Sequence, residues 1–189
     1  RLNVVALTSV PDSPLAQGAD HVVDLAAGVQ HGGVACRSYA HTLAALLALE
    51  SPELAAAAAT RAADACADLL ARREQWLPAV SEALAGPDGS WLVAPAARLC
   101  SAQQGALMLR EGPRRPAVAC ETGDWSHVDV YLTKTLDYRM LLFTGSRWQD
   151  ELLRWCTERA SVVVSVGGAV PHARYTLRYA GDDDPLVAL

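Results

Sequence analysis

The sequence has no long apolar run and no basic stripe. Its longest apolar stretches, such as 54–59 and 161–170, fall well short of the roughly 18 residues that a membrane-spanning helix needs. Sixteen basic against 21 acidic side chains give a formal net charge of -5, and no cluster of lysine and arginine offers a surface for phosphate backbones. We therefore expect neither a membrane nor a nucleic acid as partner.

Cysteines are few and isolated. None forms a Cys-x-x-Cys pair, and none has a histidine at metal-ligand spacing. The five are Cys36, Cys66, Cys100, Cys120 and Cys156. An odd number of scattered cysteines on apolar segments favours reduced thiols over disulfides, and reduced thiols are typical of the cytoplasm. The sequence thus predicts a cytoplasmic protein with no metal site and no other cofactor.

Apolar residues, mostly alanine, leucine and valine, make up 51% of the 189 residues, and this composition predicts a packed core. Short apolar runs of strand length alternate with longer segments of helical period. We expect strands over 3–8, 21–25, 91–95, 117–122, 140–144, 161–166 and 175–179. We expect helices over 34–49, 52–85 with an interruption near 77–78, 97–111 and 147–159.

This alternation predicts an α/β fold with a parallel sheet and helices on both faces. Segment 51–88 carries no strand pattern and ends in Gly-Pro-Asp-Gly-Ser, so it is interpreted as a helical connector between two lobes, 1–50 and 89–189. The chain opens almost directly on a strand, and Asp183 and Asp184 could cap a helix over 185–189. We therefore expect an incomplete first lobe and a second lobe that lacks its last helix.

Two stretches resemble the sugar isomerase (SIS) domain family. Segment 4–28 followed by 32–49 resembles the second half of an SIS domain, and 101–132 resembles the A-x-E-G-A-L-K-x-K-E…A-E…E-x-x-H-G-P segment of double-SIS proteins. The matching residues of the first stretch are Thr8, Ser13, Leu15, Ala16, Ala19, Asp20, Val34, Ala35 and Tyr39. The resemblance implies a flavodoxin-like αβα sandwich, a homodimer and a sugar phosphate as ligand.

The second stretch departs from the family pattern at two places. The glycine-rich turn G-x-G is replaced by Ala-Pro-Ala over 94–96, which stiffens the loop. The Glu and Lys of E-G-A-L-K become Gln104 and Met108, whereas the closing Glu is retained as Glu111. These three positions share one face of a helix. The resemblance places Gln104 among the substrate-binding residues.

Glu111 ends an apolar helix just before Gly112 and Pro113. A carboxylate is disfavoured at the negative end of a helix dipole, and no lysine on the same face compensates it. We therefore predict a raised pKa for Glu111, as a general base requires. The resemblance implies that this Glu moves a proton between C1 and C2 of an open-chain sugar phosphate. The alternative is a solvated Glu at a helix end.

His127 and Lys134 are two further candidates. The resemblance aligns His127 with the His of H-G-P, which is thought to help open the sugar ring, although Val128 and Asp129 replace Gly-Pro. A core or capping histidine is the alternative. Lys134, interpreted as part of a half-buried strand, could neutralise a phosphate as a substrate-binding residue, or could be an ordinary surface lysine. We assign no role to Arg37 or His31.

Three functions remain open. The preferred one is a phosphosugar isomerase, or a related amino-sugar-phosphate deaminase or deglycase, with Glu111 as base and His127 assisting. The second is a sugar-phosphate-binding protein without catalysis, consistent with the altered Gly-x-Gly, Glu and Lys positions. The third is a structural partner that uses its alanine-rich helices to dimerise. Convergence of Glu111 and His127 on one pocket would favour the enzyme, and a Glu111 on the outer surface would favour the other two.

Overall fold

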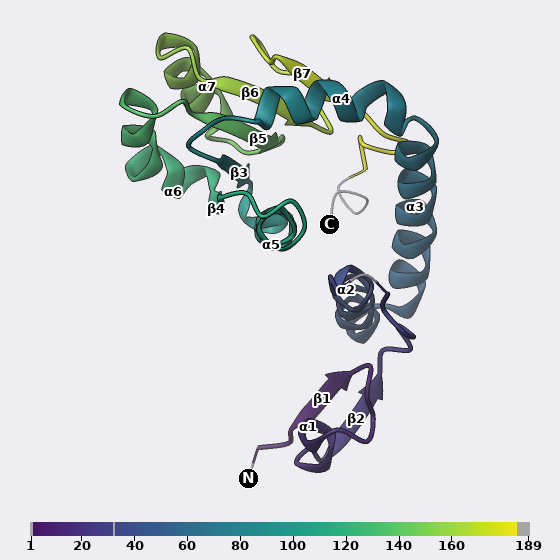
Figure 1. Ribbon diagram of the computed structural model, residues 1–189. Helices are drawn as coiled ribbons and strands as arrows, with labels where there is room; N and C mark the ends of the chain where they lie inside the picture. The colour runs from purple at the N-terminus through teal and green to yellow at the C-terminus, as the bar shows by residue number, and fades with distance from the viewer. Residues whose placement is uncertain (1, 32, 185–189) are drawn as a thin grey trace. The chain divides into compact units, whose positions relative to one another are not determined.

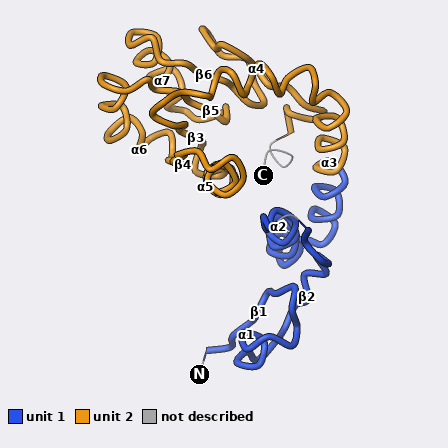
Figure 2. The backbone as a smooth tube through the Cα atoms, viewed as in Figure 1, with its two compact units in different colours: residues 1–60 blue, residues 61–189 orange. Residues whose placement is uncertain are grey.

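The computed structural model describes residues 2–31 and 33–184, so the helix expected over 185–189 lies outside the described residues. The backbone divides into two compact units, 1–60 and 61–189 (Figure 2). The boundary falls inside a long helix, α3 (Pro52–Ala71). The division into lobes and a connector at 50 and 88 stays a prediction.

The described part of the first unit contains two short parallel strands, two whole helices and the start of α3. The strands and whole helices are β1 (Val5–Thr8), α1 (Pro14–Gln17), β2 (His21–Asp24) and α2 (Cys36–Glu50). The strands pair in register from Val5 opposite His21. The one-turn helix α1 was not predicted. Its start is nevertheless encoded locally, because the Ser13 hydroxyl accepts a hydrogen bond from the Ala16 amide at 3.4 Å and Pro14 occupies the first helical position.

The second unit is built on a five-stranded parallel sheet with the order β4-β3-β5-β6-β7. The strands are β3 (Ser90–Ala94), β4 (Ala117–Glu121), β5 (Arg139–Phe143), β6 (Val162–Val166) and β7 (Tyr175–Leu177). All neighbouring pairs are parallel. The chain adds β4 on one side of β3 and β5 on the other, so the strand order reverses between β3 and β5. The parallel sheet predicted from the sequence is confirmed.

Helices cover both faces of this sheet (Figure 1). The helices α4 (Arg73–Leu84) and α5 (Leu99–Glu111) pack on one face, against Leu92 and Val164. The other face, with Val93 and Met140, is covered by α6 (Thr122–His127), the 3₁₀ helix η2 (Asp129–Lys134) and α7 (Gln149–Glu158). Successive residues of a strand point to opposite faces, which explains why neighbours such as Leu92 and Val93 enter different cores. The result is an αβα sandwich.

The interruption expected near 77–78 lies earlier in the chain, at Arg72 between α3 and α4. The Arg72 side chain binds Asp68 and donates to the Arg178 carbonyl at 2.7 Å, which holds the backbone at the bend. Trp76 donates its indole N–H to the Leu69 carbonyl at 2.9 Å, replacing a backbone donor lost at the break. Pro78 is accommodated inside α4. The predicted position was wrong, because the helix breaks at Arg72, where these contacts gather, and continues through Pro78.

None of the helices in the described part of the chain combines the length and the apolar character of a membrane-spanning segment.

Candidate functional site

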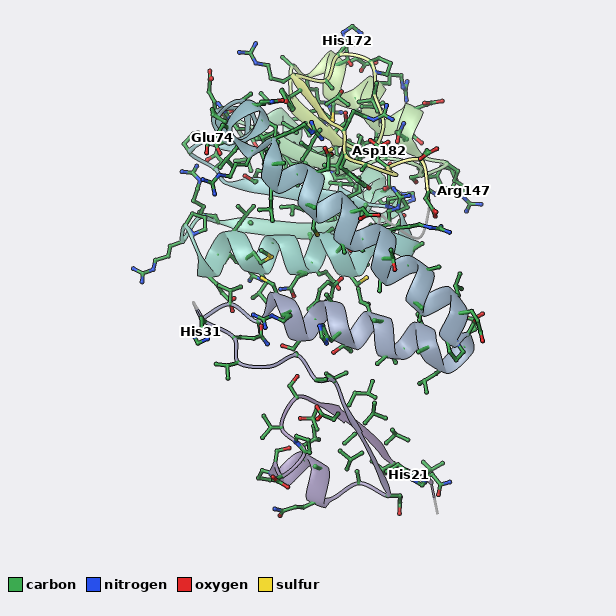
Figure 3. All side chains as sticks on the ribbon, turned by 90° about the vertical axis from the view of Figure 1, so that its right-hand side faces the viewer. His21, His31, Glu74, Arg147, His172 and Asp182 are labelled. Atoms are coloured by element: carbon green, nitrogen blue, oxygen red, sulfur yellow. The ribbon has the colours of Figure 1, made fainter. Side chains whose placement is uncertain are left out.

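Parallel α/β sheets bind ligands beyond the carboxyl ends of their strands, where loops leave the sheet. In the first unit the loop after β2 leads to α2, and a cavity of about 300 Å³ lies there. Its lining residues are Gln30, His31, Val34, Cys36 and Arg37. Figure 3 shows His31 on the loop that precedes α2. The cavity thus lies where this fold class places ligands.

The loop after β2 is shaped by tight local hydrogen bonds. The Asp24 carboxylate accepts from the Ala26 amide at 2.8 Å, and both Ala26 and Gly28 have positive φ. Arg37 Nη1 donates to the Ala27 carbonyl at 3.1 Å, with its guanidinium 3.6 Å from the position a Cβ on Gly28 would take. These contacts fasten the turn to the start of α2 and orient Arg37.

Gln30 provides the cap that the helix itself lacks. The residue at the N-cap of α2, Ala35, has no side-chain acceptor. The Gln30 carboxamide oxygen instead accepts from the Arg37 amide at 3.3 Å, while its nitrogen donates to the Ser38 hydroxyl. The amides of a helix N-terminus carry a partial positive charge, and Arg37 adds a full one. The cavity is therefore electrostatically suited to an anion.

Glu111 and Gln104 lie on the side of α5 that faces away from the sheet. Ala102 and Ala106 are buried against the sheet on the other side, Gln104 is half-buried, and Glu111 is exposed. The helix α5 joins two parallel strands, so its start lies at the carboxyl edge of the sheet and Glu111 at the amino edge. Its end is closed by the Gly112 amide, which donates to the Met108 carbonyl at 2.9 Å.

His127 is exposed and is the last residue of α6, a helix that begins at the carboxyl end of β4. Lys134 was expected on a half-buried strand, and this expectation was wrong. It is exposed at the end of η2, with its ammonium 5.4 Å from the ring centre of Tyr131. A 3₁₀ helix forms there because Val130 and Thr133 turn inward, three residues apart.

Among residues 2–31 and 33–184, no hydrogen bond or ion pair joins any two of the four predicted site residues. The predictions for Glu111, His127, Gln104 and Lys134 therefore stay predictions. The same part of the chain holds no group of three or more His, Cys, Asp or Glu side chains that could bind a metal ion.

Sequence reasoning gave no role to Arg37 and His31, which line the cavity at the start of α2. Arg37 reaches a carbonyl ten positions earlier in the chain, a contact that depends on the left-handed turn at Ala26 and Gly28. It missed Arg98 as well, which bridges the point where the strand order of the second sheet reverses. Arg98 Nη1 donates to the Thr144 carbonyl beyond β5 at 3.0 Å. Burial raises the pKa of Tyr179, and the nearby positive charge of Arg98 opposes that shift.

Comparison with solved structures shows what this fold is similar to. The C-terminal domain of glucosamine-fructose-6-phosphate aminotransferase from Francisella tularensis matches 97% of this chain with a TM-score of 0.75 and 16% identity. A protein from Clostridium difficile 630 described as a candidate phosphosugar isomerase matches 98% with a TM-score of 0.75 and 17% identity. One from Salmonella typhimurium LT2 described as a candidate sugar binding protein matches 98% with a TM-score of 0.72 and 18% identity.

The chain spans 58%, 57% and 63% of the lengths of these three structures. No family model matches the sequence, and no curated protein matches it. The likeness therefore concerns the fold alone, which is the SIS fold of these structures. The αβα architecture of SIS type predicted from the sequence is confirmed.

Proposed function

We propose that this chain binds a sugar phosphate, and that the cavity at the start of α2 takes the ligand. The observation that carries the proposal is the cavity itself, lined by Arg37, His31 and Gln30 beyond the carboxyl end of β2. The SIS-type fold supports it, since solved structures of this fold are described as candidate phosphosugar isomerases and as a candidate sugar binding protein.

Each lining group has a distinct task in this proposal. The guanidinium of Arg37 pairs with phosphate oxygens, for which its planar array of N–H donors is suited. His31 adds a ring N–H as a second donor. Gln30, already turned toward the α2 terminus, offers a carboxamide to the sugar hydroxyls. The ligand is thereby held by its charge and oriented by its hydroxyls.

Titration calorimetry of the full chain with fructose 6-phosphate, glucose 6-phosphate and free glucose tests this proposal. A charge-assisted hydrogen bond contributes about 1.5–3 kcal/mol, so Arg37→Ala should weaken binding of the phosphates at least about tenfold. Arg37→Lys should recover part of the affinity. The matched control is Arg114→Ala, which removes an exposed arginine from the second unit.

Unchanged affinity in Arg37→Ala, or equal binding of glucose and its phosphate, would contradict the proposed site. Because Arg37 also binds the Ala27 carbonyl, the thermal unfolding midpoint of each variant is measured alongside.

Isomerisation by proton transfer is the second function that we propose, with Glu111 as the base, His127 as its assistant, and Gln104 and Lys134 as substrate contacts. The SIS-type fold supports this second proposal, whereas the exposed position of Glu111 at the end of α5 is the arrangement expected for the non-catalytic function, so isomerisation is placed second. Interconversion of aldose and ketose phosphates, followed by NMR, should fall at least about a hundredfold in Glu111→Gln while ligand binding persists.

The matched control for Glu111 is Glu158→Gln, because Glu158 is also exposed and also the last residue of a helix, α7. Equal turnover in the wild type and Glu111→Gln would eliminate Glu111 as the base. Binding without turnover by the wild type would favour the non-catalytic function, and ammonia release from an amino-sugar phosphate would favour the deaminase or deglycase. The expected homodimer is tested by light scattering in the same samples.

A further inference from the structure

A second cavity, of about 520 Å³, lies at the amino edge of the sheet in the second unit. It is lined by Glu82, Ala83, Ala85, Arg139, Val162 and Arg174. These residues come from the end of α4, the first residues of β5 and β6, and the residue before β7. The cavity belongs to a different unit of the chain from the sugar-phosphate site proposed above.

Arg139 forms a fixed wall of this cavity. Its Nε and Nη2 bind the Asp137 carboxylate at 2.9 Å, and its Nη1 donates to the carbonyls of Glu82 and Ala83 at 3.2 and 3.0 Å. The positive charge is therefore balanced by Asp137 and by the negative end of α4. Arg139 shapes the cavity without leaving a free charge in it.

Two lining side chains do carry free charges. Within residues 2–31 and 33–184, neither the Arg174 guanidinium nor the Glu82 carboxylate has a hydrogen-bond or ion-pair partner. The backbone beside each is nevertheless fixed, because the Arg174 amide donates to the Val163 carbonyl at 2.7 Å and the Glu82 carbonyl accepts from Arg139. Both charged side chains are exposed, and Ala83 and Val162 add apolar surface to the lining. The cavity is thus lined by one positive group, one negative group and a nonpolar surface.

We propose that this cavity binds a small zwitterion, a molecule with a cationic amine and an anionic group. The amine pairs with Glu82, the anionic group pairs with Arg174, and the body of the ligand packs on Ala83 and Val162. A ligand with only a negative charge is attracted by Arg174 but repelled by Glu82. A ligand with only a positive charge is attracted by Glu82 but repelled by Arg174. Both charges on one ligand are therefore needed. Amino-sugar phosphates and free amino acids share this chemistry.

The test is titration calorimetry of the full chain in the Arg37→Ala background, which removes the proposed contribution of the first unit. The probes are glucosamine 6-phosphate, glucose 6-phosphate, glucosamine and L-alanine at constant ionic strength. We expect glucosamine 6-phosphate to bind at least tenfold more tightly than glucose 6-phosphate, which lacks the amine, and than glucosamine, which lacks the phosphate. If L-alanine binds as tightly as glucosamine 6-phosphate, the site is assigned to amino acids. If L-alanine does not bind and glucosamine 6-phosphate does, the site is assigned to amino-sugar phosphates.

Two variants then match each charge to its partner. Glu82→Gln should reduce the affinity for glucosamine 6-phosphate to that for glucose 6-phosphate, and Arg174→Ala should reduce it to that for glucosamine. Arg73→Ala, an exposed arginine at the start of α4, is the control. The proposal is overturned if neither zwitterion binds, or if both variants bind as the parent does. If Arg37→Ala alone leaves the affinity for the sugar phosphates unchanged, the site proposed in the first unit is refuted. The test of the cavity in the second unit is still valid in that case.

Discussion

Trp125 donates a hydrogen bond from its indole Nε1 to the hydroxyl oxygen of Tyr138 at 2.8 Å, and both side chains are buried. The Tyr138 ring also stacks on Trp91, with 4.2 Å between ring centres. Burial raises the pKa of Tyr138, and the hydrogen bond from Trp125 only partly opposes this shift. The hydroxyl is therefore neutral throughout the ordinary pH range and serves as a structural acceptor.

Tyr138→Phe should lower the free energy of unfolding by about 1–3 kcal/mol, because the buried Trp125 N–H then has no acceptor. Urea titration followed by tryptophan fluorescence measures the change. Tyr131→Phe is the control, since Tyr131 is 63% exposed. A loss equal to that of the control would show that Trp125 finds another partner.

Gly89→Ala should destabilise the second unit more than Gly145→Ala. Both glycines have positive φ, 95° and 104°, so each alanine pays backbone strain of about 1–3 kcal/mol. At Gly89 the new Cβ would also lie 2.6 Å from the Pro116 carbonyl oxygen, whereas at Gly145 it meets nothing within 4 Å. The thermal unfolding midpoints of the two variants are compared. Gly145→Ala measures the backbone strain alone, and any further loss in Gly89→Ala measures the steric overlap with Pro116. Equal midpoints would mean that the segment at Pro116 moves freely.

Acid should weaken the segment after β7. The Arg178 side chain hydrogen-bonds the Asp182 carboxylate and lowers its pKa, and the Tyr179 amide acts in the same direction. A pKa below the unfolded value of about 3.9 means that this stabilisation is present above about pH 4 and is lost as the pH falls through the folded pKa. Asp182→Asn should therefore destabilise the protein more at pH 7 than at pH 2.5.

The control for Asp182 is Asp183→Asn, which removes the same charge from its exposed neighbour. Unfolding by urea at both pH values gives the comparison. A difference between wild type and Asp182→Asn that persists unchanged at low pH would contradict the assignment.

Cys66 should react with a disulfide reagent at pH 8 well before Cys156. Cys66 is exposed, whereas Cys156 is 2% exposed and burial raises its pKa to about 12, with the charge of Arg159 opposing the shift. The thiolate is the reacting form, so Cys156 should be labelled only on unfolding. Mass spectrometry of peptides from a labelling time course identifies the order. Early labelling at Cys156 would show that α7 opens in the native state.

Much of the sheet was predictable because its strands are continuous apolar runs, as expected for strands buried on both faces. The helix α6 was not, since six residues containing Gly123 carry no helical period. Its start depends instead on Glu121, whose carboxylate accepts from the amides of Gly123 and Asp124. A short helix defined by its cap leaves little trace in apolar spacing.

The candidate site was less predictable than the fold. Glu111 was correctly expected at a helix end, but the sequence could not show that α5 places this end at the amino edge of the sheet. The Arg37 side chain is held by the Ala27 carbonyl, which is placed by a left-handed turn at Ala26 and Gly28. An alanine at position 26 does not predict such a turn. Side chains oriented by distant backbone groups are recognised only once the chain is folded.

Within the described residues, β4 is an edge strand of the second sheet: it hydrogen-bonds to β3 on one side and to no strand on the other. Pro116 precedes this strand and Glu121 ends it, while the exposed Val118 stands between them. An edge strand with free backbone groups can pair with a strand of another chain. Pro116 turns its carbonyl to the Ser90 amide of β3, and the Glu121 carboxylate is bound by the amides of Gly123 and Asp124, so neither flanking residue blocks the outer side of β4. Misassembly of newly made chains would therefore begin at this margin.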